Sequence, residues 1–248
     1  MRPHSFARSR SGMLSWMADA RDIYQSAPDT YDALVSYEDH AGQLLEAIRK
    51  LVTLDGADVV ELGAGTGRVT RLLAPHVRSI RAFEREPAML AVAHAHLKRL
   101  GMHHCELALA DNAKLPIPDA CAHISIAGWT YGHQTVWEPQ GWQIPIRAAL
   151  AEMLRVLRPG GTAIVIETLG SGYTEPFDPP TELARYYELL ERDYGFTRSW
   201  IRTDYVFPSN AEGERLLHAF FGAEAARAFA AGGGTLLPEC TGIWSRRL

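Results

Sequence analysis

The 248-residue chain is poor in cysteine, has no large excess of charge of either sign and contains no long apolar run. Its three cysteines, Cys105, Cys121 and Cys240, are far apart and form no C-x-x-C pair, which indicates free thiols in a reducing compartment. The net charge of -4 provides no general attraction to nucleic acid or to an anionic membrane. We therefore expect a cytoplasmic protein that binds neither.

Metal-ligand spacing is also missing, because the histidines do not form a convincing cluster. His94 and His96, for example, are two positions apart on an expected helix and so do not share a face. We predict no metal site.

The first residues are basic and include only a short apolar stretch, residues 13–17. This stretch is too short and too polar for the core of a signal peptide, and far too short to span a bilayer. We expect residues 1–18 to be a disordered tail or the product of an over-extended start before Met17, and a transit peptide is the remaining alternative. Residues 19–248 are then expected to form one domain, with its core over residues 55–170 and its C-terminal strands and helical cover over residues 180–248.

Short apolar runs alternate with segments of helical periodicity through the first two thirds of the chain. The expected strands are residues 58–62, 79–83, 105–110, 124–127 and 162–168, and the expected helices are residues 31–54, a segment after Gly67, 87–100 and 145–157. Such alternation builds a parallel sheet with helices on both faces. The remainder predicts helices over residues 181–193, 210–221 and 223–230 and strands over 197–207 and 237–244, which makes a helical insertion between the last two strands.

Three glycines, Gly63, Gly65 and Gly67, follow the first expected strand. Their G-x-G-x-G spacing fails the dinucleotide template, which needs a glycine where Arg68 stands, and no Gly-Lys-Ser/Thr of a phosphate loop follows. Glu61 adds a carboxylate at the strand end, which would repel a pyrophosphate but favours a cation. The glycines would let the backbone approach such a ligand closely.

Two more acidic residues, Glu84 and Asp111, end the second and third expected strands. A carboxylate at the first position can accept both hydroxyls of a ribose. At the second position a carboxylate can accept from an adenine amino group, while the backbone N–H of Asn112 or Ala113 donates to a ring nitrogen. Either residue alone is equally a solvated strand-end charge, but three acidic residues at three successive strand ends fit S-adenosylmethionine (SAM), which has an ammonium and a sulfonium but no phosphate.

The sequence resembles the class I SAM-dependent methyltransferases from about residue 58 to residue 168. The matching segments are VVELGAGTG at residues 59–67, FEREPAML at 83–90, Asp111 with LPIPD at 115–119, and LRVLRPGG at 154–161. Among subgroups the chain is most similar to the small-molecule methyltransferases of the ubiquinone/menaquinone-biosynthesis type. One departure is Ala122-His123, which stands where the family usually opens the fourth strand with an aspartate.

The resemblance implies a Rossmann-like, doubly wound α/β fold whose seven-stranded sheet is mostly parallel with an antiparallel last strand. It also implies SAM as cofactor, with the region around Tyr24 and Tyr31 folded over it. Together with the strand-end residues this predicts the cofactor contacts Tyr24, Tyr31, Glu61, Gly63, Ala64, Gly65, Thr66, Gly67, Glu84, Arg85, Met89, Asp111, Asn112, Ala113, Gly128 and Trp129.

The acceptor site is expected in the aromatic loop after the fourth strand, which lies beside the cofactor at the carboxyl edge of the sheet. His133 is our candidate for a general base and Tyr131 the second candidate. For His133 the alternative is a histidine that only hydrogen-bonds the loop backbone. The aromatic side chains of the loop suit an apolar or flat substrate, or packing around a sulfonium, and for Trp137 and Trp142 the alternative is that they anchor the loop onto the next helix. The insertion that contains Phe220 and Phe221 is expected to cover the site, with these two rings in ordinary packing.

The predicted activity is methyl transfer to O, N or C of a small molecule. The Asn/Asp-Pro-Pro-aromatic run of nucleic-acid and glutamine methyltransferases is absent, since residues 127–130 read Ala-Gly-Trp-Thr. A SAM-binding protein with a regulatory or structural role is the alternative. A nicotinamide dehydrogenase is disfavoured by Glu61 and by the missing glycine at position 68.

Overall fold

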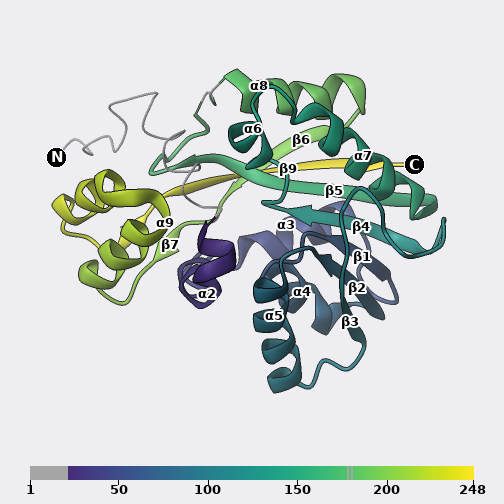
Figure 1. Ribbon diagram of the computed structural model, residues 1–248, viewed down its shortest axis with the longest axis horizontal. Helices are drawn as coiled ribbons and strands as arrows, with labels where there is room; N and C mark the ends of the chain where they lie inside the picture. The colour runs from purple at the N-terminus through teal and green to yellow at the C-terminus, as the bar shows by residue number, and fades with distance from the viewer. Residues whose placement is uncertain (1–21, 178, 180) are drawn as a thin grey trace.

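The computed structural model describes residues 22–177, 179 and 181–248, so the expectation for residues 1–18 lies outside the described residues (Figure 1). One sheet forms the centre of the molecule. Its strands, in spatial order, are β3 (Cys105–Leu109), β2 (Ser79–Glu84), β1 (Asp58–Leu62), β4 (Ala122–Gly128), β5 (Leu157–Ser171), β9 (Glu239–Arg247) and β6 (Thr197–Arg202). Strand β9 runs antiparallel to both its neighbours, and the pairs from β3 to β5 are parallel. The predicted fold class is confirmed.

Helices cover both faces of this sheet, because alternate side chains of the buried strands face opposite layers. Val59 of β1 joins the core formed with α3 (Gln43–Leu51) and α4 (Arg68–Leu73). Val60 joins the core formed with α7 (Gln143–Arg155) and α8 (Thr181–Glu188). Figure 1 shows these two helical layers on either side of the strands.

The helix predicted over residues 87–100 has the same bounds in the structure. Helix α5 (Pro87–Leu100) begins with Pro87 in its first turn and ends at Gly101, whose φ of 65° is the left-handed conformation that stops a helix. The remaining short elements are the 3-10 turn η1 (Ala74–His76), helix α6 (Gln134–Trp137) and the π-helical turn η2 (Leu189–Asp193), which continues α8.

A small second layer covers one end of the sheet. It consists of α2 (Pro28–Val35), α9 (Asn210–Ala231) and the two-stranded sheet of β7 (Tyr205–Val206) and β8 (Leu236–Leu237), packed around their own hydrophobic cluster. Helix α9 bends at Gly222, where the sequence predicted a break between two helices. The helical insertion between the last two strands of the main sheet is therefore present, at the left of Figure 1.

Two element predictions were wrong. The expected helix over residues 31–54 is two helices, α2 and α3, separated by a turn that contains Gly42 at φ 65°. The expected strand over residues 197–207 divides into β6 and β7, which belong to different sheets. The apolar periodicity of the sequence continues across both breaks. It does not reveal that the apolar residues on the two sides of a break face two different hydrophobic clusters.

The residue that departs from the family pattern, His123, still makes a hydrogen bond at the start of β4. Its Nδ1 accepts the backbone N–H of Asp58 at 3.0 Å, and Arg158 lies against both residues. The bonds from Arg78, Ser79 and Arg158 hold the pKa of the Asp58 carboxyl well below its usual range. A histidine thus ties β4 to β1 in place of the aspartate.

Candidate functional site

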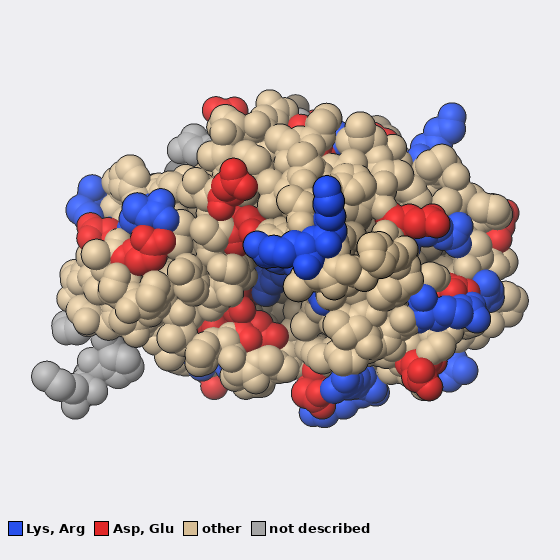
Figure 2. All heavy atoms as spheres, turned by 90° about the horizontal axis from the view of Figure 1, so that it is seen from below, with Lys and Arg blue, Asp and Glu red and all other residues tan. Residues whose placement is uncertain are grey.

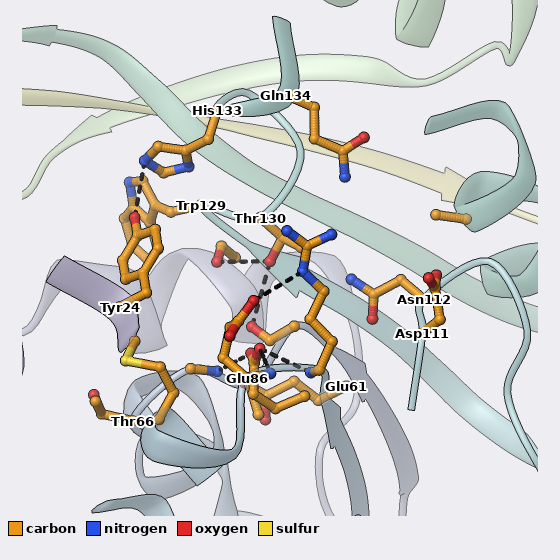
Figure 3. A pocket seen from close by; sticks show the side chains of 18 of the residues that line it. Tyr24, Glu61, Thr66, Glu86, Asp111, Asn112, Trp129, Thr130, His133 and Gln134 are labelled. Carbon is orange, nitrogen blue, oxygen red and sulfur yellow. Dashed lines mark hydrogen bonds and ion pairs between the residues drawn. The ribbon is translucent and has the colours of Figure 1, made fainter. Parts of the chain in front are cut away.

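A cavity opens at the carboxyl edge of the sheet, where the loops after β1, β2, β3 and β4 meet. Its walls include every predicted cofactor contact except Gly67: Tyr24, Tyr31, Glu61, Gly63, Ala64, Gly65, Thr66, Glu84, Arg85, Met89, Asp111, Asn112, Ala113, Gly128 and Trp129. Figure 3 shows the labelled side chains pointing into this space from several different strand ends. We call it the first cavity.

The glycine loop approaches the first cavity with backbone conformations that favour glycine. Gly63 has φ 72°, and a Cβ there would lie 2.4 Å from the side chain of Thr130. Gly65 has φ 56°, and the nearest described atom to its Cβ position is Met89 Cε at 3.5 Å. Gly63 is therefore required by the protein itself, whereas the space beside Gly65 is left for a ligand.

Gly67 does not line the cavity, so the structure separates it from the other predicted contacts. It precedes α4 with φ 82°, and a Cβ there would lie 3.2 Å from the Cβ of Ala93 in α5. The close approach of α4 and α5 explains this glycine.

Glu61 is a buried carboxyl at the base of the first cavity, with 2% of its surface exposed. The hydroxyl of Thr70 donates to its Oε2 at 2.6 Å. Burial, and to a smaller extent the charge of Glu84, raises the pKa of Glu61 to about 8. A cation bound beside this carboxyl would favour its ionised form and lower that pKa.

Glu84 organises the glycine loop, which the sequence did not reveal. Its Oε2 accepts the N–H of Gly65 at 2.8 Å, and its Oε1 accepts the N–H groups of Arg85 and Glu86 at 2.8 and 2.9 Å. A carboxylate offers about four lone-pair positions, so about one is left for a ligand hydroxyl rather than the two we expected.

Four buried polar atoms around the first cavity have no hydrogen-bond partner among the described residues. They are Thr66 Oγ1, Arg68 Nη2, Asn112 Oδ1 and Gln134 Oε1. Leaving a buried polar atom unpaired costs about 1–3 kcal/mol, so their convergence on one cavity indicates a polar ligand. Arg68 and Gln134 are additions to the predicted set, and only tertiary structure brings them here.

Asp111, unlike its neighbour Asn112, has no buried side-chain oxygen without a hydrogen-bond partner. It is exposed, and its Oδ1 accepts the N–H of Ala113 at 2.8 Å, which stabilises the turn after β3. The unpartnered acceptor at this strand end is therefore on Asn112.

Trp129 holds a backbone conformation that side chains rarely adopt, with φ 51°. Its N–H donates to the Ile166 carbonyl at 2.7 Å, and the Arg68 guanidinium lies 3.8 Å from the centre of its ring. Arg68 in turn donates to Glu38 at 2.8 Å. Strain of this kind costs of order 1–3 kcal/mol and persists where surrounding contacts enforce it, often at functional sites.

His133 lines the first cavity and contacts Tyr24, whose hydroxyl lies 3.1 Å from His133 Nε2 (Figure 3). Burial lowers the pKa of His133 to about 4, against the opposing effect of its hydrogen bond to the Trp129 backbone. The ring is therefore neutral at pH 7. Burial also raises the pKa of Tyr24 well above its usual value, so its hydroxyl stays protonated.

Tyr131, the second candidate base, is fully buried and lines neither the first cavity nor the second, adjoining cavity described below. Burial raises the pKa of its hydroxyl far above the ordinary range. We therefore withdraw it. Trp142 is also buried and donates to Glu182 at 3.0 Å, so it anchors the loop, whereas Trp137 lines the first cavity and packs its ring 6.0 Å from that of Tyr24.

A second cavity adjoins the first and shares Tyr24, Tyr31, Arg68, Trp129 and His133 with it. Its other walls are Leu34, Val35, Glu38, Gly132, Glu167, Thr168, Ser171, Leu183, Tyr205, Phe220, Phe221 and Glu239. The two phenylalanines that we expected in ordinary packing thus line a cavity. The covering layer of α2 and α9 closes this side of the site.

Neither membrane spans nor metal clusters are found in the described part of the chain. None of its helices is long and apolar enough to cross a bilayer. The described residues also contain no group of three or more His, Cys, Asp or Glu side chains placed to hold a metal ion.

Comparison with known proteins places residues 59–161 within a family model described as a methyltransferase domain. Among curated proteins the chain is 30% identical over 149 residues to the malonyl-[acyl-carrier protein] O-methyltransferase of Serratia marcescens, covering 60% of this chain and 52% of that protein. It is 28% identical over 153 residues to the demethylmenaquinone methyltransferase of Bacillus cytotoxicus, covering 59% of this chain and 61% of that protein. The match thus spans between half and two thirds of the length of these relatives.

Solved structures share the fold at low sequence identity. The [4+2]-cyclase SpnF is similar with a TM-score of 0.60 and 17% identity, covering 94% of this chain and 96% of that one. A SAM-dependent methyltransferase from Aquifex aeolicus is similar with a TM-score of 0.51 and 16% identity, covering 96% of this chain and 98% of that one. A cyclase among these neighbours means that the fold alone does not establish a reaction.

Proposed function

We propose that the chain transfers the methyl group of SAM to O, N or C of a small molecule, because residues 59–161 match a family model described as a methyltransferase domain. The family resemblance predicted from the glycine motif is confirmed by this match and by the curated relatives. One observation carries the proposal furthest: the predicted cofactor contacts and four unpartnered polar atoms surround one cavity.

The residues around the first cavity fit SAM. Glu61 provides a buried carboxyl for the ammonium group of SAM. The unpartnered Nη2 of Arg68 suits the carboxylate in the methionine part of SAM. Glu84 retains capacity for one ribose hydroxyl. Asn112 Oδ1 suits the adenine amino group. In this assignment Asn112 takes the adenine contact that we predicted for Asp111.

SAM, when bound, supplies a methyl group that is already activated on its sulfonium. The contribution of the chain is therefore alignment, which can supply roughly 7–11 kcal/mol in ideal cases. His133 and Tyr24 line both cavities, so they lie where a nucleophile held in the second cavity would meet the first. With a pKa of about 4, His133 is a weak proton acceptor, and we assign it a positioning role for the nucleophile together with the Tyr24 hydroxyl, which lies 3.1 Å from its Nε2.

A small-molecule acceptor is supported by the enclosed second cavity and by the surface. On the face seen in Figure 2, basic and acidic side chains are interspersed and do not form a basic stripe like those that follow a phosphate backbone. The three free cysteines, Cys105, Cys121 and Cys240, support a reducing, cytoplasmic location.

Calorimetry with SAM and S-adenosylhomocysteine (SAH) tests the cofactor assignment. We expect one site per chain for each, with SAH bound at micromolar affinity or better. Release of methyl-labelled product from a metabolite panel then separates an enzyme from the alternative, a SAM-binding protein without methyl transfer. A folded sample that binds neither compound would sink the proposal, and binding without product on any acceptor would favour the alternative.

Replacing His133 by alanine is expected to lower kcat by about 10- to 100-fold on an acceptor found in that panel, with SAH affinity within about threefold of wild type. Loss of an orienting hydrogen bond and of its packing accounts for that range. Because His133 is neutral above pH 5, the wild-type rate should show no inflection near pH 6.5. A bell-shaped profile centred on a histidine would contradict the positioning role. Gln143→Ala, a surface change at the start of α7, is the control.

A further inference from the structure

The second cavity differs from the first in its walls. Most of its surface is apolar or aromatic, contributed by residues at and before α2, by the loop after β4 and by α8, β7 and α9. Its apolar and aromatic walls are Tyr24, Tyr31, Leu34, Val35, Trp129, Leu183, Tyr205, Phe220 and Phe221. A cavity with such walls binds a compact apolar body.

Three carboxylates also face this cavity, against one cation. Glu38 is paired with Arg68 at 2.8 Å and also accepts the Thr203 hydroxyl at 2.9 Å. The other two, Glu167 and Glu239, have no basic side chain within hydrogen-bond distance among the described residues, and each is 2% exposed. The second cavity therefore has more carboxyl groups than basic groups in its walls.

Glu167 and Glu239 differ in how their oxygens are used. Oε1 of Glu167 accepts the N–H groups of Tyr131 and Gly132, both at 3.0 Å, which clamps the loop that carries His133. Oε1 of Glu239 accepts the Thr168 hydroxyl at 2.6 Å, whereas its Oε2 has no hydrogen-bond partner in the described part of the chain. Burial, and to a smaller extent the charge of Glu38, raises the pKa of Glu239 to about 8, against the opposing effect of the Ser171 and Thr168 side chains.

We propose that the second cavity binds the methyl acceptor, and that this acceptor is an aromatic or alicyclic molecule with a protonated amine held by Glu239. This inference rests on the proposed methyl transfer. The unpartnered, buried Oε2 of Glu239 is a hydrogen-bond acceptor that an ammonium would satisfy, and the ring of Tyr205, which also lines this cavity, adds cation–π attraction.

The two ends of the second cavity are expected to hold two different groups of the acceptor molecule. Glu239, Thr168 and Ser171 stand at walls that the first cavity does not share, whereas His133 and Trp129 stand at the shared end. The ammonium at Glu239 is therefore an anchor, and the atom that is methylated lies toward His133. An acidic acceptor is disfavoured, since it would lie against the carboxyls of Glu167 and Glu239, and the unpartnered Nη2 of Arg68 is assigned above to the carboxylate of SAM.

Three probes of similar size and different charge test this assignment: 2-phenylethylamine, 2-phenylethanol and 3-phenylpropionate. Each is titrated by calorimetry into the wild-type protein saturated with SAH, at pH 7.5. We expect the amine to bind most tightly, the alcohol more weakly and the carboxylate most weakly. The Glu239→Gln variant should weaken amine binding by about 10- to 100-fold and leave the alcohol within about threefold. Glu224→Gln, an exposed change on α9, should alter none of the three affinities.

The assignment is overturned if the carboxylate binds as tightly as the amine, if the amine does not bind at millimolar concentration, or if Glu239→Gln leaves amine binding unchanged. If Glu239→Gln does not fold, the wild-type order of the three probes decides alone. SAH binding in the same samples keeps the two proposals distinct. If SAH does not bind, the cofactor assignment fails. Titration of the amine into the protein without SAH then still tests the second cavity.

Discussion

The Gly65→Asp variant is expected to fold and to lose SAH binding by more than about 100-fold. The Cβ position of Gly65 faces the first cavity, where the nearest described atom is a Met89 methyl at 3.5 Å. An aspartate there would fill space meant for the ligand and would place a second carboxylate near Glu84, whose Oε2 accepts the Gly65 N–H. Equilibrium dialysis or calorimetry with SAH measures the loss.

The control must separate the loss of space from backbone strain, because Gly65 has φ 56°. Gly101 has φ 65°, no atom within 4 Å of its Cβ position, and stands at the end of α5 outside the cavity. Gly101→Asp therefore carries a similar strain of about 1 kcal/mol and should bind SAH normally. Equal losses in the two variants, or normal binding by Gly65→Asp, would show that the glycine loop does not hold the cofactor.

The free energy of unfolding is expected to fall by about 2 kcal/mol or more between pH 6.5 and pH 8 in the protein without ligand. Burial raises the pKa of Glu61 and Glu239 to about 8 and that of Glu167 to about 7. In the unfolded chain these groups titrate near pH 4.5, so above that pH the folded protein binds more protons. Their stabilising contribution is complete below about pH 4.5 and is lost as the pH rises through about 7–8. Urea unfolding at a series of pH values measures the slope.

The lower limit of that window is set by His133, whose pKa is lowered to about 4 and which therefore acts in the opposite direction. Its effect is confined to the range below the unfolded histidine value of about 6.5, so the slope above pH 6.5 reports the carboxyls. Glu61→Gln removes one of these titrating carboxyls. The slope of the free energy of unfolding against pH should therefore become shallower by about 1.4 kcal/mol per pH unit at most. A flat profile in the wild type would mean that the site carboxyls are solvated or paired by cations in solution.

The strand-end residues show how far sequence reasoning reaches in this fold. Gly63, Gly65, Glu61 and Glu84 follow apolar runs that pair as parallel strands, so their place at one edge follows from topology alone. The bond from Glu84 to the Gly65 N–H, in contrast, depends on how the second loop turns back. Asn112 and Asp111 are adjacent in sequence, and only the turn after β3 determines which one presents a free oxygen.

The second cavity could not be predicted from the sequence, because segments far apart in the chain form its walls. Its walls come from residues near position 31, the loop after β4, the end of β5, and α9. No local pattern marks Glu239 or Phe220, because β9 and α9 read as an ordinary strand and helix. Tyr131 and His133 are two positions apart, yet the clamp by Glu167 leaves Tyr131 buried and His133 at the cavity.

By itself the sequence determined the fold class, the mostly parallel sheet and the glycine loop with its acidic neighbours, since hydrophobic period and glycine spacing are local properties of the chain. Tertiary structure decided which buried polar atoms lack partners, and hence where ligands are expected. Whether Glu61 or Glu239 is protonated, and whether Glu239 keeps a free oxygen, depends on burial and on groups distant in sequence, and long-range packing alone sets these.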